Sequence, residues 1–92
     1  MSAKSSNRAP AEKIAESDKS LAECVEESLN IYFDNLKGHE PSEVYNMVLA
    51  EVERPMLKVV LERVGGNQSK AAQMLGLSRG TLRKKIRLYG LA

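Results

Sequence analysis

The sequence predicts an all-α fold of four helices per chain, two long and two short, and three observations support this prediction. From residue 20 onward, apolar residues recur every three or four positions, which is the period of an amphipathic helix. Residues that favour helix starts and ends stand at the borders of these stretches. In the last quarter, a glycine-containing turn separates two short helical segments. With 92 residues, the chain is long enough for one domain.

The first long helix is expected to begin after Ser20 and to end near Lys37 and Gly38. Ser20 and Glu23 have the spacing of a capping box, in which each side chain accepts a hydrogen bond from the other residue's backbone N–H. Gly38 suits the left-handed conformation that often follows a helix. The apolar stripe of this helix consists of Leu21, Val25, Leu29, Tyr32, Phe33 and Leu36.

The second long helix is expected to run from a Ser42 cap to about Val64, where two glycines end it. Its apolar face consists of Val44, Met47, Val48, Val52, Met56, Val59, Val60 and Val64. Pro55 lies inside this pattern and has no backbone N–H to donate. Because the apolar pattern continues on both sides of Pro55, we expect the proline to kink the helix without ending it.

These two helices, joined by a short loop, are expected to form an antiparallel hairpin with one apolar side uncovered. We expect a second copy to cover that side and complete a dimeric four-helix bundle, since small folds gain stability by association. The alternative is that the C-terminal helices cover it within one chain. In the dimer, residues 20–66 would form a helical dimerisation core, preceded by a flexible, polar N-terminal arm at residues 1–19. The expected dimer core consists of Leu29, Tyr32, Phe33, Leu36, Val48, Val52, Met56 and Val59.

Residues 67–92 have the pattern of a helix-turn-helix. Asn67 is expected to cap a helix at 68–75, and Ser78 to cap a helix at 79–88. In the turn between them, Gly76 would adopt the positive φ that the chain reversal demands. The small core of this motif is expected to consist of Ala71, Ala72, Leu75, Leu77, Leu82 and Ile86. Such a motif holds its second helix where it can enter the major groove of DNA.

Charge is distributed unevenly along the chain. Residues 1–64 carry 8 Lys and Arg against 12 Asp and Glu, a net charge of −4, whereas residues 65–92 carry a net charge of +6 without any acidic residue. A wholly basic end on a mildly acidic body indicates a polyanionic partner. The six basic side chains are those of Lys70, Arg79, Arg83, Lys84, Lys85 and Arg87.

We predict that this region binds double-stranded DNA. Arg83, and next Arg79, are the best candidates for bidentate contacts to guanine O6 and N7. The start of the helix at 68–75 offers backbone amides and polar side chains that suit a phosphate. The outer face of the last helix is expected to present Arg79, Thr81, Arg83, Lys84, Lys85 and Arg87. The full predicted DNA-binding set is Asn67, Gln68, Ser69, Lys70, Ser78, Arg79, Thr81, Arg83, Lys84, Lys85 and Arg87.

Residues 66–85 (GNQSKAAQMLGLSRGTLRKK), followed by Tyr89 and Gly90, closely resemble the DNA-binding end of the Fis (factor for inversion stimulation) family. Similar residues upstream extend the resemblance to about residues 21–92; they are Tyr32, Phe33, Gly38, Tyr45, residues 48–53, Pro55 and Leu57. The resemblance implies a homodimeric, nucleoid-associated bacterial protein that bends DNA at degenerate sites and regulates transcription and recombination. It also implies a recombinase or RNA polymerase as a further partner, and DNA contacts from Asn67, Ser69, Arg79, Thr81, Arg83, Lys84 and Lys85.

The chain departs from the family pattern at three places. Ser78 stands where the best-known member has Asn, so we expect a different base preference beside the cap. Gly65 replaces a basic residue, which is expected to weaken contacts with flanking DNA. The arm at 1–19 does not align well, so the resemblance does not carry inversion stimulation over to this chain.

DNA bending also follows from a geometric condition. Two recognition helices on one dimer must enter successive major grooves, about 34 Å apart on straight DNA. If the dimer holds them closer together, the duplex must curve and its central minor groove must narrow. A/T-rich centres lower the energy of that deformation, so we expect sites with such centres to be preferred.

Other classes of function have little support in the sequence. Cys24 and His39 are the only cysteine and histidine, so a Cys/His metal site would require these two to meet, and we expect no metal or cofactor. Since His39 falls in a polar loop and Cys24 beside an apolar stripe, neither is placed as a catalytic group, and we expect no enzymatic activity. No apolar run approaches the roughly 20 residues of a membrane span, and residues 1–10 lack a secretory signal, so a cytoplasmic location is expected. The resemblance implies that this location is the nucleoid. The main alternative is a helical protein-interaction and dimerisation module without specific DNA recognition.

Overall fold

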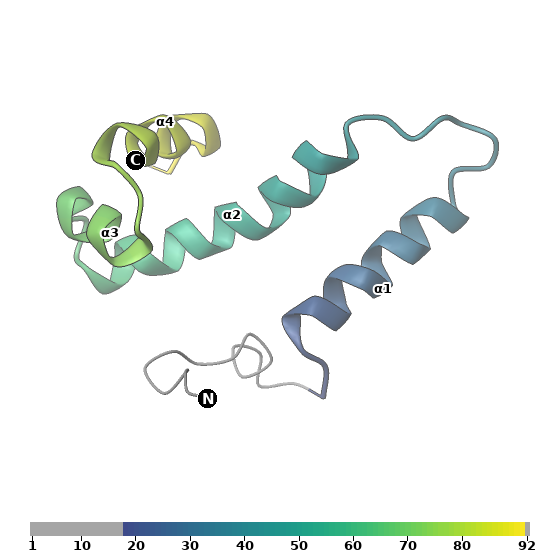
Figure 1. Ribbon diagram of the computed structural model, residues 1–92, viewed down its shortest axis with the longest axis horizontal. Coiled ribbons are helices and arrows are strands. Elements are labelled where there is room, and N and C mark those ends of the chain that lie inside the picture. The colour runs from purple at the N-terminus through teal and green to yellow at the C-terminus, as the bar shows by residue number, and fades with distance from the viewer. Residues whose placement is uncertain (1–17, 92) are drawn as a thin grey trace, which may run out of the picture. The chain divides into compact units, whose positions relative to one another are not determined.

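The computed structural model describes residues 18–91, and the regular secondary structure in that range is entirely helical (Figure 1). The all-α prediction of four helices is therefore confirmed. The chain divides into two compact units, one ending at Ser42 and the other beginning at Glu43. The predicted arm at residues 1–19 lies almost entirely outside the described residues. The helices are α1 (Leu21–Asp34), α2 (Val44–Arg63), α3 (Gln68–Leu75) and α4 (Arg79–Tyr89).

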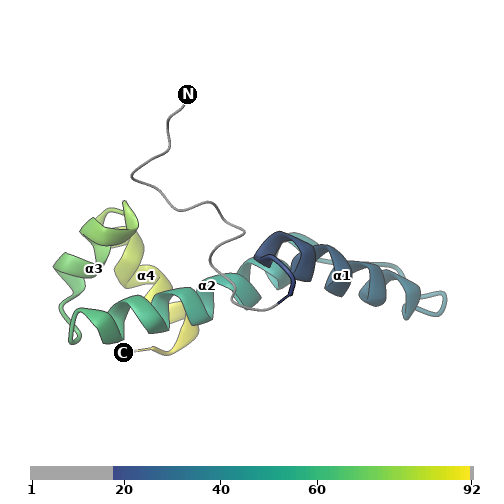
Figure 2. The ribbon, with the colours of Figure 1, turned by 90° about the horizontal axis from the view of Figure 1, so that it is seen from below.

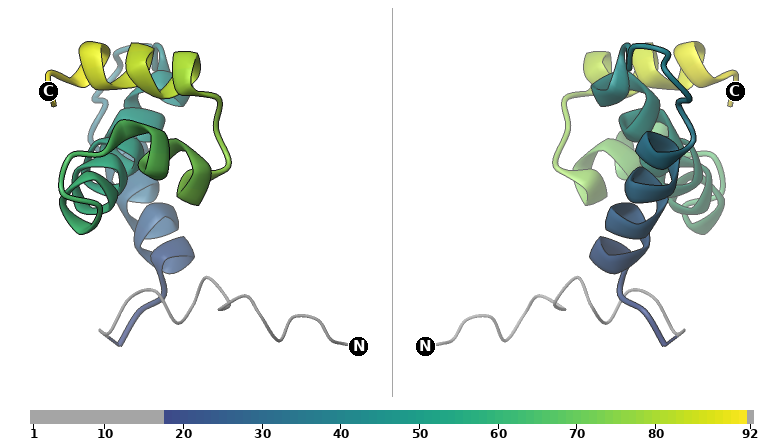
Figure 3. Two further views of the ribbon diagram at one scale, coloured as in Figure 1. Left: turned by 90° about the vertical axis from the view of Figure 1, so that its left-hand side faces the viewer. Right: turned by 90° about the vertical axis from the view of Figure 1, so that its right-hand side faces the viewer.

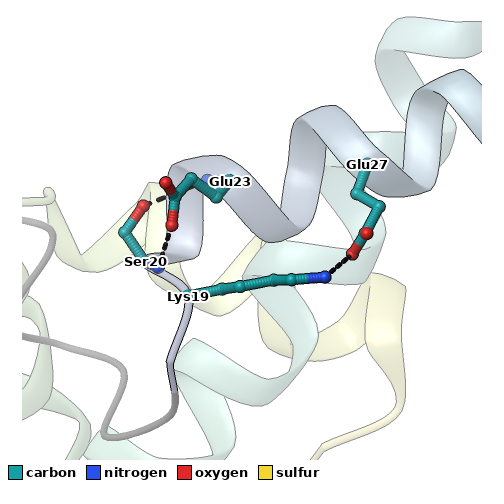
Figure 4. Close-up of polar contacts among 4 residues, drawn as sticks. All are labelled: Lys19, Ser20, Glu23 and Glu27. Carbon is teal, nitrogen blue, oxygen red and sulfur yellow. Dashed lines mark hydrogen bonds and ion pairs between the residues drawn. The ribbon is translucent and has the colours of Figure 1, made fainter.

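The start of α1 confirms the predicted capping box (Figure 4). The Ser20 backbone N–H donates to Glu23 Oε1 over 2.9 Å, and the Glu23 backbone N–H donates to Ser20 Oγ over 3.1 Å. Lys19 adds an ion pair with Glu27, which lies two turns into the helix. The two hydrogen bonds of the capping box thus satisfy two backbone N–H groups that have no partner within the helix.

The end of α1 differs from the prediction, because the helix stops at Asp34 and not near Lys37. The Asn35 N–H is shared between the carbonyls of Ile31 and Tyr32, which is typical of a helix terminus. Lys37 and Gly38 then adopt positive φ angles of 53° and 87°. A right-handed helix cannot include such residues, so the apolar spacing that extends to Leu36 overestimates its length.

The start of α2 also corrects the sequence analysis, which placed Ser42 at the cap. The N-cap residue is Glu43, whose φ of 54° is left-handed and whose side chain makes no capping hydrogen bond. A capping side chain needs an extended backbone to reach the next turn, and this turn of the chain does not provide one. The prediction for Pro55 is confirmed in part: α2 continues through it to Arg63, while the kink stays a prediction.

The second unit is held together by one small apolar core between α2, α3 and α4, which contact one another (Figures 2 and 3). Its buried members are Leu57, Ala71, Ala72, Leu82 and Ile86. The two alanines of α3 allow the helices to approach closely. Leu77, which was predicted to join this core, is only partly buried. Its backbone N–H instead donates to the Ala72 carbonyl over 2.9 Å and closes the turn.

Gly76→Ala is expected to lower the free energy of unfolding by about 1–2 kcal/mol. Gly76 ends α3 at a φ of 77°, where a side chain strains the backbone, although nothing lies within 4 Å of the added Cβ. Gly80→Ala is a matched control, because Gly80 lies inside α4 with similarly open space and without a positive φ. Urea denaturation should show a loss for Gly76→Ala and none for Gly80→Ala. Equal losses would show that the left-handed turn is not the cause.

Candidate nucleic-acid interface

The N-termini of α3 and α4 are both fixed by the side chains predicted to cap them. Asn67 Oδ1 accepts a hydrogen bond from the Lys70 N–H over 3.1 Å. Ser78 Oγ accepts from the Thr81 N–H over 3.1 Å and lies 2.9 Å from Thr81 Oγ1, to which it is hydrogen-bonded. These bonds hold the first turn of each helix in place while leaving the polar residues of that turn exposed.

The turn between α3 and α4 is built on a left-handed glycine. The Gly76 N–H donates to the Gln73 carbonyl over 3.2 Å, and the Leu77 N–H donates to the Ala72 carbonyl over 2.9 Å. This double closure satisfies carbonyls at the end of α3 and redirects the chain into α4. Leu82 and Ile86 anchor α4 in the core, so the helix-turn-helix predicted from the sequence is confirmed as a structural motif.

Most of the predicted DNA-binding side chains lie exposed. On α4, no ion pair within residues 18–91 involves Arg79, Arg83, Lys84 or Arg87, so these cations face solvent. At the other end of the motif, the start of α3 presents polar side chains and one lysine. The exposed members of the set are Asn67, Gln68, Ser69, Lys70, Ser78, Arg79, Thr81, Arg83, Lys84 and Arg87.

Lys85 is the exception, and its predicted place on the outer face of α4 is wrong. Its Nζ lies 3.0 Å from Glu53 Oε2 and 3.1 Å from Oε1, and its side chain is only 25% exposed. Lys85 stands next to Ile86 and three residues after Leu82, so it borders the buried stripe of α4 and faces α2. A list of basic residues does not distinguish the border of a stripe from its exposed side.

Glu53 is the functional candidate that the sequence analysis missed. Its carboxylate also accepts a hydrogen bond from Tyr89 Oη over 2.7 Å, and the Arg54 guanidinium lies 5.3 Å from the centroid of the Tyr89 ring. We call Glu53, Arg54, Lys85 and Tyr89 the Glu53 cluster. The available signal was helical spacing, because Glu53 precedes the buried Leu57 by one turn and therefore shares its side of α2.

The protonation of Glu53 and Tyr89 is coupled through their hydrogen bond. Partial burial acts to raise the pKa of Glu53, but the hydrogen bonds from Tyr89 and Lys85 and the charge of Lys85 outweigh it, so the pKa lies below its usual 4.5. The pKa of Tyr89 lies above its usual 10.0, because its hydroxyl donates to Glu53, desolvation disfavours the phenolate, and the carboxylate repels it.

The lowered pKa of Glu53 predicts an acid-sensitive contribution to stability. A carboxylate whose pKa is lower in the folded state stabilises the fold above the unfolded pKa, and this contribution disappears as pH falls through the folded value. Wild type should therefore be more stable than Glu53→Gln at pH 7, and the difference should shrink below about pH 4.5. Urea denaturation across this range checks the prediction, and a difference that does not change with pH would contradict it.

The predicted dimer-core side chains retain accessible apolar surface. No residue of α1 is buried; Leu29, Tyr32 and Leu36 are half-buried, and Phe33 is 47% exposed. The Tyr32 and Phe33 rings pack edge to face, with centroids 5.3 Å apart. On α2, Val48 and Val52 are half-buried, whereas Met56 and Val59 are exposed.

Neither a metal-binding cluster nor a membrane-spanning helix is present among the described residues. Between residues 18 and 91, no three side chains of the types His, Cys, Asp and Glu come together as a metal site would require. Cys24 is partly buried on α1, and His39 is exposed in the loop that follows it. None of the helices in this range combines the length and the apolar character needed to cross a membrane.

Comparison with known proteins identifies the family to which this chain belongs. The family model described as bacterial regulatory protein, Fis family, matches residues 48–89, which include most of α2 and all of α3 and α4. The chain is similar to the DNA-binding protein Fis of Glaesserella parasuis, with 49% identity over 74 residues covering 80% of this chain and 76% of that protein. It is 54% identical over 71 residues to a Fis-like protein of Neisseria meningitidis, covering 77% and 90% of the two chains. It is 48% identical over 73 residues to the DNA-binding protein Fis of Proteus mirabilis, covering 79% and 74%. The chain belongs to the Fis family.

Proposed function

We propose that this protein binds duplex DNA with its α3–turn–α4 motif and that α4 enters the major groove. The observation that carries the proposal is the set of exposed cations on a capped, core-anchored α4, for which the described residues provide no ion pair. Cations without internal partners are available to replace counterions on DNA phosphates, which supplies affinity. The names of the related proteins from Glaesserella and Proteus support the same function.

Within this proposal, the exposed residues divide into two roles. Arg83 and Arg79 read guanine edges, because a guanidinium can donate two parallel hydrogen bonds to O6 and N7. The other polar residues bind the DNA backbone and fix the register of the protein on the duplex. This second group consists of Asn67, Gln68, Ser69, Lys70, Thr81, Lys84 and Arg87. Ser78, at the cap of α4, lies beside the base-reading arginines and influences base preference.

The protein acts as a homodimer in this proposal. The partly exposed apolar side chains of α1, such as Phe33, and those of α2, such as Val59, support a second copy as their cover. Two copies supply two recognition helices, as successive major grooves require, and a separation below about 34 Å would bend the DNA. Residues 20–66 would serve dimerisation, and residues 67–92 would serve DNA binding.

The resulting role is that of a DNA-bending, nucleoid-associated regulator of transcription and recombination in the bacterial cytoplasm. It needs no catalytic step and no cofactor, since binding and bending are sufficient to organise DNA for other proteins. A recombinase or RNA polymerase would be the partner that uses the bent complex. The preferred site has an A/T-rich centre, because such sequences narrow their minor groove at lower energy.

Fluorescence anisotropy with labelled duplexes of roughly 27 bp, enough for two half-sites and their flanks, tests the proposal. One duplex has an A/T-rich centre and the other a G/C-rich centre, and both are titrated across a salt series. Tighter binding to the A/T centre, with affinity falling steeply as salt rises, is expected. Absence of binding at low salt would overturn the proposal and favour the interaction-module alternative.

Sedimentation equilibrium tests the homodimer separately from DNA binding. The protein is expected to sediment with twice its chain mass of 10.2 kDa at micromolar concentration. Phe33→Asp should shift it toward the monomer, because a charge replaces an apolar side chain at the proposed interface. A monomer at all concentrations would contradict the two-half-site arrangement.

A further inference from the structure

We propose that Glu53 acts as an internal counterion that keeps Lys85 away from the DNA backbone and thereby limits sequence-independent binding. The inference rests on the proposed DNA-binding function and deepens it. Among the basic side chains of α4, Lys85 is the one for which the described residues supply a carboxylate partner. Glu53 is thus a positioning residue, since it affects DNA through Lys85.

The geometry gives the carboxylate a fixed place. Glu53 Oε1 accepts hydrogen bonds from Tyr89 Oη at 2.7 Å and from Lys85 Nζ at 3.1 Å, while Oε2 lies 3.0 Å from the same Nζ. The Glu53 side chain is only 13% exposed. Both oxygens are therefore engaged, and the tyrosine hydroxyl holds the carboxylate in place independently of the lysine.

Partial burial makes this pair hard to exchange. A charge pair that is shielded from solvent is less weakened by water and salt than a pair on the open surface. Moving Lys85 onto a phosphate would leave the Glu53 carboxylate largely buried, with the Tyr89 hydroxyl as its remaining donor among the described residues, which costs free energy. We therefore expect the Lys85–Glu53 pair to persist in the DNA complex.

The consequence for recognition is selective. Phosphate contacts strengthen binding to every sequence, whereas contacts to base edges distinguish one sequence from another. Withholding one lysine from the phosphates weakens binding to all duplexes and leaves the contacts of Arg83 unchanged. Glu53 would thus increase the share of the binding free energy that depends on sequence.

The test is the salt dependence of binding to a duplex without a preferred site. The probe is a labelled duplex with a G/C-rich centre, titrated by the full-length protein between 50 and 200 mM salt. Glu53→Gln keeps an oxygen that can accept from Tyr89 but removes the charge that holds Lys85. Its slope of log affinity against log salt should be steeper than wild type by about 0.9 for each bound copy, which is about a 3.5-fold larger loss over this range.

Two further variants and one control show whether Glu53→Gln changes the slope through Lys85. Lys85→Gln alone should have the wild-type slope, and Glu53→Gln combined with Lys85→Gln should return to that slope. Glu51→Gln is the matched control, because Glu51 is an exposed acid two residues earlier on α2 and its loss changes net charge equally. It is expected to leave the slope unchanged within about 0.3, since the slope counts phosphate contacts and not net charge.

Either of two results would overturn the inference while leaving the proposed function intact. A slope that becomes shallower by about 0.9 in Lys85→Gln would show that Lys85 already contacts phosphate in the wild type. Equal steepening in Glu51→Gln and Glu53→Gln would show a general charge effect. Because Lys85→Gln keeps Glu53, it tests the inference even if Glu53→Gln fails to fold. Wild-type protein that does not bind either duplex would instead reject the proposed function.

Discussion

Arg83→Ala is expected to lower affinity for the preferred A/T-centred duplex by roughly 5- to 160-fold, corresponding to about 1–3 kcal/mol for a bidentate base contact. Arg83 is exposed on α4 and lies outside the apolar core, so the free energy of unfolding should change by less than about 0.5 kcal/mol. Anisotropy titrations of the wild type and of Arg83→Ala on this duplex measure the affinity, and urea denaturation of both proteins measures the stability.

The matched control for Arg83 is Arg87→Ala, one turn further along α4. Both arginines are exposed, but the proposal gives Arg87 a phosphate and Arg83 a base. Arg87→Ala should weaken binding to all duplexes alike and make the salt slope shallower by about 0.9. If Arg83→Ala behaved in the same uniform way, Arg83 would be a phosphate contact; if it had no effect, α4 would not be the recognition helix.

Leu57→Ala is expected to lower the free energy of unfolding by about 2–5 kcal/mol. Leu57 is 0% exposed and lies where α2 meets α3 and α4 in a core with only five buried members. A cavity at this place removes contacts that the small core cannot replace, so the helix-turn-helix should lose order and DNA affinity together. Thermal or urea denaturation followed by far-ultraviolet circular dichroism measures the effect.

Leu88→Ala provides the comparison for Leu57→Ala, because it removes the same atoms from a leucine that is 72% exposed on α4. Its cost is expected to stay below about 0.5 kcal/mol. Equal destabilisation by the two substitutions would contradict the position of the core. A large effect of Leu88→Ala alone would point to an interface that covers the exposed face of α4.

The parts of the fold that the sequence predicted correctly depend on short-range chemistry. Ser20, Asn67 and Ser78 each accept a hydrogen bond from the backbone N–H three residues later, so the residue types and their spacing are sufficient to locate a helix start. Gly76 was predictable for a similar reason, because a tight turn between two helices requires positive φ.

The parts that the sequence did not predict depend on loop geometry or on distant residues. The backbone at Lys37 and Glu43 is left-handed, although neither residue type favours that conformation, and these two residues displaced the predicted borders of α1 and α2. Lys85 was assigned to the wrong face because its partner, Glu53, is 32 residues away in the chain. Periodicity locates a buried stripe but does not identify which polar residue at its border meets a neighbouring helix.

The candidate site was therefore predictable in its residues more than in their surroundings. Helical spacing turns Lys84 and Arg87 away from Leu82 and Ile86, so their exposure followed from the sequence. Arg79 stands three residues before Leu82 and Arg83 three before Ile86, so spacing alone did not separate these exposed arginines from Lys85. The dimer core differs from this site, because it forms only when a second copy of the chain is present. Its side chains were identified by spacing, and their assembly stays a prediction.

Chemical-shift mapping by NMR tests most directly whether this protein binds DNA through α3 and α4. Isotope-labelled full-length protein is titrated with an unlabelled A/T-centred duplex of roughly 27 bp. The largest changes in backbone amide shifts are expected at residues 67–70 and 78–84, with smaller changes along α1. Changes concentrated in Leu21–Asp34, or no changes at saturating duplex, would contradict the account.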